Sequence, residues 1–278
     1  MMKSRRPILL LLLLAAAFTT TAVALVQAQQ RFRGEGASHP LRAGMPDAGV
    51  PGGFTFCRLW YDQVRSEPSG IGWSTDYPRG DQNFVTRLTQ LTAVRATQWR
   101  DGEPGHAALR ATDPALFGCP FLFAVDAGTI GLSTEEAARL REYLLKGGFL
   151  WLDDFWGERA WEHWVAQLHR ILPEYDVVDV PSDHRLFNTF YVVPKLPQIP
   201  SMQHWTRSGG NTAEFGPENP PHLRAVFDEH GRILVLMTHN TDIGDGWERE
   251  TDSEVFFQLF SPPAYGVAMN VAIWVLTH

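Results

Sequence analysis

Gly147-Gly148-Phe149-Leu150-Trp151-Leu152-Asp153-Asp154-Phe155-Trp156-Gly157 is the stretch that decides the fold. A Gly-Gly turn opens it, four apolar residues follow, and two adjacent carboxylates end the apolar run. An apolar run of this length behind an amphipathic helix is typical of a central strand in a parallel sheet that is covered on both faces. Ligands of open α/β sheets bind beyond the carboxyl ends of such strands. Asp153 and Asp154 are therefore the leading candidates for a functional site.

The segments on either side of this strand predict alternating helices and strands. Ser133 and Glu136 form a capping-box pattern that starts a helix ending at Gly147. A second helix with an apolar face follows Gly157 and ends at Pro173. Further strands are expected at 54–61, 107–111, 121–125 and 176–180, with a hairpin at 224–228 and 232–238, a helix capped by Asp81, and a closing helix at 265–276. This alternation predicts an α/β fold with an open, doubly wound, mostly parallel sheet.

The chain divides into three expected parts. Residues 1–28 have the basic start, the Leu/Ala-rich core and the small-residue end of a secretory signal peptide, with cleavage after Ala28. The apolar run 7–26 is also long enough for an uncleaved N-terminal anchor. Residues 29–53 form a Gly/Pro-rich linker, and residues 54–278, about 225 in number, suffice for a single domain. That domain carries a loop-rich insertion at about 181–221. The protein is thus expected to be periplasmic or otherwise exported, with membrane anchoring as the alternative.

The net charge bears on the class of binding partner, and the cysteine content bears on disulfide formation. The net charge is −7 at pH 7, and no cluster of Lys and Arg follows residue 28, so a nucleic-acid partner is not expected. The two cysteines, Cys57 and Cys119, would form a disulfide in an oxidising compartment or remain as two buried thiols. Because both flank predicted core strands, where disulfide geometry is demanding, the two thiols are the favoured interpretation.

Two acidic stretches supply candidate site residues. Asp153 and Asp154 point to opposite sides if the strand continues. They are interpreted as a general base or metal ligands, or as a helix cap and a partner of an arginine. The loop 240–248 adds oxygen ligands of the kind that Ca²⁺ or Mg²⁺ prefers, although its spacing is not that of an EF-hand, and a loop held by its own Asx turns is the favoured alternative. Its candidates for ligand binding are Asn240, Asp242, Asp245, Trp247 and Glu248. A divalent cation would use Asp153, Asp242 and Asp245, and no other cofactor is recognised.

The loop after the first strand and one histidine complete the candidates. Asp76, Tyr77 and Asn83 follow the strand at 54–61, on the same sheet edge as Asp153. Tyr77, Trp73 and Trp156 could form an aromatic platform for a sugar, and ordinary loop packing is the alternative. His239 follows a strand into the polar loop and is a candidate for catalysis. The chain has no Gly-x-Ser-x-Gly elbow, phosphate loop or dinucleotide fingerprint, which excludes the commonest hydrolase and cofactor-binding classes.

Five stretches carry a family resemblance: Phe54-Thr55-Phe56-Cys57-Arg58-Leu59-Trp60-Tyr61, Asp76-Tyr77-Pro78 with Asp81 and Asn83-Phe84, Thr112-Asp113-Pro114, residues 144–157 and residues 240–248. In them the chain resembles the bacterial domain-of-unknown-function family numbered 4159, over about residues 54–278. That family is similar to the class I glutamine-amidotransferase-like superfamily. The resemblance implies a flavodoxin-like sheet in an exported or membrane-linked protein and implies no established activity.

The same resemblance bears on one reaction. In amidotransferases of that superfamily the nucleophilic cysteine follows a strand of this kind, but here Asp153 and Asp154 stand at that place and neither cysteine is near it in the chain. A carboxylate cannot replace a thiolate in this chemistry, so glutamine amidotransferase activity is not expected.

Three functional hypotheses follow from the sequence. The first is a non-catalytic envelope protein that binds a small polar ligand, such as a glycan, or a partner protein at the edge carrying Asp76, Asp153, Asp154 and Asp242. The second is a hydrolase with Asp153 or Asp154 as general base, with or without a divalent cation. The third is a structural subunit of a membrane assembly that makes contact through the closing helix or the Trp161–Trp164 face.

Overall fold

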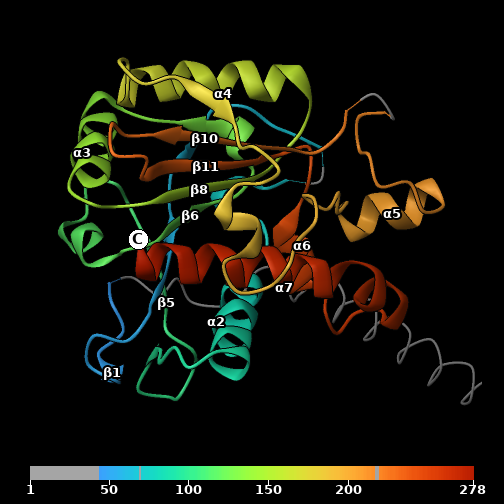
Figure 1. The fold of residues 1–278 in the computed structure, drawn as a ribbon, viewed down its shortest axis with the longest axis horizontal. Coiled ribbons are helices and arrows are strands. Elements are labelled where there is room, and N and C mark those ends of the chain that lie inside the picture. Colours follow the sequence, from blue (N-terminus) through green and yellow to red (C-terminus); the bar gives the residue numbers. More distant parts are fainter. Residues whose placement is uncertain (1–43, 69, 217–218) are drawn as a thin grey trace, which may run out of the picture. The chain divides into compact units, whose positions relative to one another are not determined.

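A seven-stranded sheet with the strand order β5-β2-β6-β8-β11-β10-β9 forms the centre of the computed structural model, which describes residues 44–68, 70–216 and 219–278 (Figure 1). Strand β8 (Leu150–Phe155) holds the apolar run and pairs in parallel with β6 (Leu122–Ala124) and β11 (Ile233–His239). Strand β2 (Phe56–Leu59) pairs in parallel with β5 (His106–Leu109) and β6. At the other edge β10 (His222–Phe227) and β9 (Val177–Asp179) pair antiparallel. The predicted single α/β domain with a mostly parallel sheet is confirmed.

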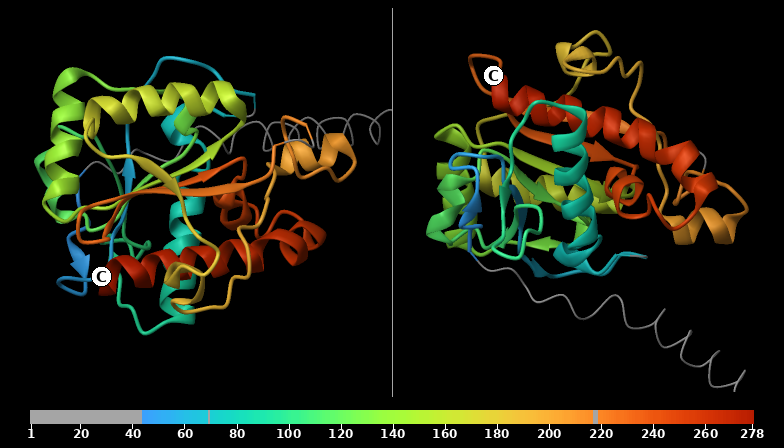
Figure 2. Two further views of the ribbon diagram at one scale, coloured as in Figure 1. Left: turned by 45° about the horizontal axis from the view of Figure 1, so that its top comes forward. Right: turned by 90° about the horizontal axis from the view of Figure 1, so that it is seen from below.

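Successive side chains of β8 enter two different cores. Leu150 and Leu152 lie in a core with α3 (Thr134–Leu145) and α4 (Gly157–Ile171), whereas Trp151 lies in a second core with α2 (Arg79–Leu91) and α7 (Glu254–Thr277). Figure 2 shows these two pairs of helices on opposite faces of the sheet. Because both faces are covered, both sets of side chains must be apolar. This explains why the run shows no alternation of polar and apolar residues.

Short elements complete the described part of the chain. They are the strand pairs β1 (Ala48–Gly49) with β4 (Thr97–Gln98) and β3 (Asp62–Gln63) with β7 (Ile130–Gly131), the 3₁₀ turns η1 (Gly72–Ser74), η2 (Pro114–Gly118), η3 (Ala127–Thr129) and η4 (Arg185–Asn188), and the helices α5 (Met202–Ser208) and α6 (Ile243–Glu248). The predicted signal peptide and the first part of the predicted linker, residues 29–43, lie outside the described residues.

One predicted helix start is confirmed and another is wrong. The Ser133 hydroxyl accepts a hydrogen bond from the backbone N–H of Glu136, whose carboxylate accepts one from the N–H of Ser133, so the capping box opens α3 as predicted. Helix α2 begins at Arg79, before the predicted cap Asp81. Asp81 is instead buried against Arg58, whose Nε donates to Asp81 Oδ1 at 2.9 Å. A buried guanidinium needs a carboxylate partner, and this tertiary requirement places Asp81 inside the helix.

Two segments are more helical than the sequence suggested. The loop predicted at 240–248 contains helix α6, which Asp242 caps by accepting a hydrogen bond from the N–H of Asp245 at 2.7 Å. The closing helix α7 begins at Glu254 rather than near residue 265 and continues through Pro262 and Pro263. The insertion packs against this helix, because Asn270 Oδ1 accepts the N–H groups of residues 190 and 191. Packing against the sheet and the insertion stabilises helices that local propensity leaves uncertain.

The two cysteines form a disulfide, which corrects the favoured interpretation of two separate thiols. Cys57 on β2 and Cys119, which precedes β6, have Cα atoms 6.1 Å apart. Because β2 and β6 are neighbouring strands and η2 brings the chain back beside β2, the geometry that a disulfide requires is met. Both residues are buried in the core with α3 and α4.

Helix α7 is the one helix in the described ranges with the length and apolar composition of a membrane span. In its most apolar window 61% of the residues are buried within the domain. A core helix of a folded domain also has these properties.

Candidate functional site

Three adjacent parallel strands end in a residue with left-handed backbone. Asp126 follows β6 with φ +52°, Asp154 lies at the end of β8 with φ +50°, and Asn240 follows β11 with φ +59°. Asp and Asn adopt this conformation more readily than other residues with a side chain. A left-handed residue redirects the backbone after β6 and β11 and makes an irregularity within β8, and polar residues stand at these positions along the carboxyl edge of the sheet. This is the edge on which the sequence placed the site.

Both carboxylate oxygens of Asp153 are hydrogen-bonded inside the protein. Its carboxylate is fully buried and accepts hydrogen bonds from Thr238 Oγ1 at 2.5 Å and from the N–H of Gly244 at 2.8 Å. Burial raises the pKa of Asp153 to about 7. These contacts attach β8 to β11 and to the first turn of α6. A carboxylate held in this way cannot reach a substrate in solution without losing both bonds.

Asp154 lies at an irregularity of β8, where its backbone is left-handed and the register with β11 shifts between Met237 and His239. It is partly exposed, and its Oδ1 accepts a hydrogen bond from the indole Nε1 of Trp156 at 2.9 Å. Burial, together with the negative charges of Glu214, Asp126 and other nearby acids, raises the pKa of Asp154 well above its ordinary value. Of the two adjacent acids, Asp154 is therefore the one that can meet a ligand.

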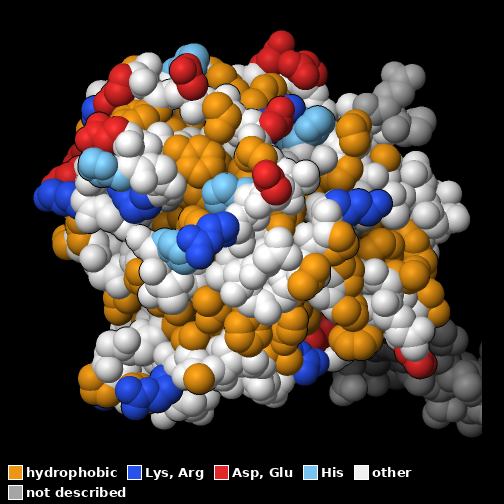
Figure 3. Space-filling model, in the orientation of Figure 1, with side chains coloured by type: hydrophobic (Ala, Val, Ile, Leu, Met, Phe, Trp, Pro, Cys, Tyr) orange, Lys and Arg blue, Asp and Glu red, His pale blue; other side chains and the backbone are white. Residues whose placement is uncertain are grey.

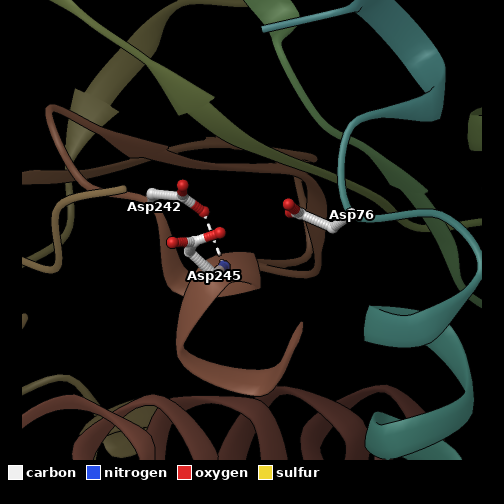
Figure 4. Close-up of side chains that lie close together, drawn as sticks. All are labelled: Asp76, Asp242 and Asp245. Atoms are coloured by element: carbon white, nitrogen blue, oxygen red, sulfur yellow. Dashed lines mark hydrogen bonds between the residues drawn. The ribbon is translucent and has the colours of Figure 1, made fainter. Parts of the chain in front are cut away.

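Asp76, Asp242 and Asp245 form a buried cluster of carboxylates (Figure 4). One oxygen of each lies within 4.8 Å of the corresponding oxygens of the other two. Asp76 comes from the loop before α2 and has φ +63°, whereas the other two belong to the first turn of α6. The sequence placed Asp153 with Asp242 and Asp245, but in the structure Asp153 lies against the backbone of Gly244 and Asp76 completes the triad.

Burial dominates the electrostatics of this cluster. It raises the pKa of Asp76 well above its ordinary value, with Glu248 and Asp245 adding to the effect. Burial also raises the pKa of Asp242 well above its ordinary value and raises the pKa of Asp245 to about 7. Carboxylates this close in a buried place ionise together only with a compensating positive charge.

The other candidates from the loop 240–248 have structural partners. Asn240 Oδ1 accepts the N–H of Gly157 at the start of α4, and its Nδ2 donates to Pro220 O at 3.0 Å. Trp247 is fully buried in the core with α2, and Asn83 Nδ2 donates to its carbonyl oxygen at 2.8 Å. Glu248 forms an ion pair with Arg249 at 2.8 Å. These contacts tie α6 to α2 and β11 to α4.

In the described part of the chain, the hydrogen-bonding neighbours of the His239 ring are a carbonyl oxygen and a guanidinium, and no carboxylate activates it. Its Nε2 is 3.2 Å from Gly157 O, and its Nδ1 is 3.2 Å from an Arg224 guanidinium nitrogen. Burial lowers the pKa of His239 to about 4, so the ring is neutral at physiological pH. The neighbouring guanidinium favours the same neutral form.

The predicted aromatic platform has a different composition. The rings of Trp73 and Tyr77 have centroids 5.4 Å apart, and the ring of Trp60 lies 5.5 Å from that of Trp73. Trp156 is only 4% exposed, and its indole nitrogen is bonded to Asp154. Trp60 therefore takes the place in the cluster that the sequence assigned to Trp156.

Two acids near Asp154 were not among the sequence candidates. Asp126 accepts the N–H of Gly72 at 2.7 Å, and burial raises its pKa to about 6. Burial likewise raises the pKa of Glu67 to about 7, and the negative charge of Asp126 adds to the shift. Asp126 ends a strand in the same way as Asp154, and that position was a signal in the sequence. Glu67 lies in an irregular loop and had no such signal.

Comparison with protein families gives a match to one family model, described as domain of unknown function (DUF4159), over residues 55–276. No curated protein matches the chain. The match covers the sheet, its helices and every candidate residue on the carboxyl edge.

Proposed function

Since the chain belongs to the DUF4159 family, whose description names no activity, we propose its function from the site: it is an exported, non-catalytic domain that binds a small polar ligand at Asp154. The observation that carries the proposal is the position of this carboxyl group. It is partly exposed at a left-handed residue near the carboxyl end of β8, whereas Asp153 beside it is fully buried.

The fold class that we propose is flavodoxin-like, in the class I glutamine-amidotransferase-like superfamily. The five parallel strands have the order β5-β2-β6-β8-β11, which in chain order is the arrangement 2-1-3-4-5 of flavodoxin-like sheets. In this class the turn after β8 would hold the nucleophile. Asp154 lies in the last residues of β8, directly before that turn, and the chain's two cysteines are joined to each other. Glutamine hydrolysis through a cysteine nucleophile therefore has no thiol to use.

The chemistry around Asp154 favours a ligand that donates hydrogen bonds. The Trp156 indole N–H engages Oδ1 of Asp154, and the acids nearby disfavour a second anion. Sugar hydroxyls and amines meet these requirements, whereas phosphates and carboxylates do not.

Thermal unfolding of the purified chain in the presence of single sugars and amines tests the proposal. We expect at least one of these compounds to raise Tm in the wild type and to lose this effect in Asp154→Asn. The matched control is Asp179→Asn, at an exposed acid on β9 that pairs with Arg224. A compound that stabilises all three proteins equally would contradict binding at Asp154.

The alternative function is a hydrolase, in which Asp154 rather than Asp153 would carry acid–base chemistry. The raised pKa of Asp154 supports it, because a raised pKa makes a carboxyl group a better candidate for a general acid. Hydrolysis of nitrophenyl esters or glycosides by the wild type and the Asp179→Asn variant, but not by Asp154→Asn, would favour the hydrolase over the binding domain.

Export is part of the proposal. Residues 1–28 have the pattern of a signal peptide, with an uncleaved anchor as the alternative, and the Cys57–Cys119 disulfide suits an oxidising compartment. Mass spectrometry of the protein from the cell envelope distinguishes a chain that begins at Gln29 from one that keeps its N-terminus.

A partner protein in the envelope is the second kind of ligand. The Trp161–Trp164 face does not offer a docking surface, because Trp164 is buried and the Arg224 guanidinium covers Trp161 at 4.1 Å. The first turns of α7 do expose Val255 and Leu259, and Figure 3 shows hydrophobic side chains gathered over this region and α5. A partner would therefore meet the start of α7.

A further inference from the structure

The carboxylates of Asp76, Asp242 and Asp245 converge on one point from two separate segments. Figure 4 shows Asp76 directed from its loop toward the other two acids at the start of α6. All three are buried, with exposures of 7%, 2% and 2%. Three oxygens, one from each group, lie close enough for one ion to contact all of them, because a bound Ca²⁺ or Mg²⁺ keeps its oxygen ligands at about 2.0–2.6 Å.

One oxygen in this cluster has no hydrogen-bond partner among the residues that the structure describes. Asp76 Oδ2 is buried and accepts no hydrogen bond, although buried carboxylate oxygens are normally satisfied. It faces Gly244, where a Cβ atom would overlap it. Oxygens of the other two acids do have protein partners. Asp242 Oδ1 accepts from the N–H of Asp245, whereas Asp245 accepts from the N–H of Met202 with Oδ2 at 2.5 Å and from Arg249 Nε with Oδ1 at 3.3 Å. The unpartnered oxygen therefore points to a group that the protein itself does not supply.

The balance of charges around the three carboxylates also indicates a missing positive group. Arg249 pairs with Asp245, Glu248 and Asp252, so a single guanidinium faces several acids. Arg58, a buried cation whose charge also acts on Asp76, is already paired with Asp81. An uncompensated charge in a buried site is costly, so the cluster needs either protons or a cation. Oxygen donors alone, without nitrogen or sulfur, are the ligand set of hard divalent cations.

We propose that Asp76, Asp242 and Asp245 bind one divalent cation, Ca²⁺ or Mg²⁺. The ion joins the loop before α2 to the first turn of α6, a turn that Asp153 holds through the N–H of Gly244. Its role is to fix the carboxyl edge of the sheet next to Asp154. The ion uses none of the atoms of Asp154, but the site lies close enough for the charge of Asp154 to act on Asp242.

The test compares the purified wild-type chain, freed of metal by chelation, with two variants. Asp76→Asn removes one charge from the cluster and suits the left-handed backbone, which asparagine adopts readily. Asp126→Asn is the matched control, because residue 126 has nearly the same φ and a raised pKa but lies outside the cluster. Asp242→Asn is a second test variant that keeps a capping oxygen for α6 if Asp76→Asn does not fold.

In the wild type and in Asp126→Asn we expect CaCl₂ or MgCl₂ to raise Tm by about 5–10 °C at about 100 times Kd. Equilibrium dialysis with elemental analysis should find one bound ion per chain, and separate titrations with the two salts identify which ion binds more tightly. Asp76→Asn or Asp242→Asn should lose both the Tm shift and the bound ion. The proposal is overturned if neither salt gives a saturable shift or a bound ion in the wild type, or if the variants bind as well as the wild type. Greater stability of metal-free Asp76→Asn without any ion binding to the wild type would show that protons neutralise the cluster.

Discussion

Reduction of the Cys57–Cys119 disulfide should destabilise the domain by an amount set by the length of the loop that it closes. The bridge joins residues 62 positions apart in the chain. In the chain-entropy model such a crosslink lowers the entropy of the unfolded state enough to contribute about 4 kcal/mol to stability. With a urea m value of about 3 kcal/mol/M, the midpoint of unfolding should fall by about 1.3 M on reduction.

Urea unfolding followed by tryptophan fluorescence, with and without the reductant TCEP, measures this change. Both cysteines are buried, so TCEP reaches the disulfide mainly when the domain unfolds. Each sample must therefore be incubated until reduction and unfolding are both at equilibrium. The double variant Cys57→Ala/Cys119→Ala is the control: it has no bridge, so its midpoint should not respond to TCEP. The variant also loses sulfur packing in the core, which is why the comparison within the wild type gives the cleaner magnitude.

One result would refute this reasoning. If the oxidised-buffer sample shows two reactive thiols in urea and its midpoint is the same with TCEP, the cysteines are the separate thiols that the sequence alone favoured. An unchanged midpoint together with a reducible bridge would instead show that the unfolded state keeps enough structure to cancel the entropic effect.

Three further predictions address buried charges. Arg58→Met should cost about 3–5 kcal/mol in urea unfolding because it leaves Asp81 buried without its partner. Arg100→Met, at an exposed pair with Asp47, should leave the unfolding midpoint almost unchanged; equal losses in the two variants would contradict the assignment. Glu67, which faces Asp126 and Arg65, has its pKa raised to about 7 in the fold, so the folded state binds more protons and stability is lost as pH rises from about 4.5 through 7. Unfolding at pH 5 and 7.5 should show a smaller loss in Glu67→Gln than in the wild type, by up to about 3 kcal/mol, and parallel profiles would rule this out. The pKa of His239 is lowered to about 4, so its contribution to stability is present above pH 6.5 and is lost as pH falls through 4. The NMR signals of its ring should stay those of a neutral imidazole at pH 5. A titration midpoint near 6.5 would show that the ring is not desolvated.

Local sequence signals predicted most of the elements. The capping box at Ser133, the apolar run of β8 and the hairpin of β10 and β11 all depend on residues within a few positions of one another, and the structure confirms them. The errors have tertiary causes. Asp81 was taken for a helix cap because its distant partner Arg58 could not be seen, and α6 was taken for a loop although packing against α2 and α7 stabilises so short a helix.

The sequence by itself determined that acids stand at the carboxyl edge of a sheet covered on both faces. The reason is that these acids directly follow apolar runs with the pattern of buried strands. Only the tertiary structure decided which acids meet. Asp76 joins Asp242 and Asp245 across a long separation in the chain, whereas Asp153 accepts hydrogen bonds from Thr238 and from the N–H of Gly244. The physical reason is that the pleat of β8 and the left-handed turns at Asp76 and Asp154 direct each carboxylate, and burial then sets its charge.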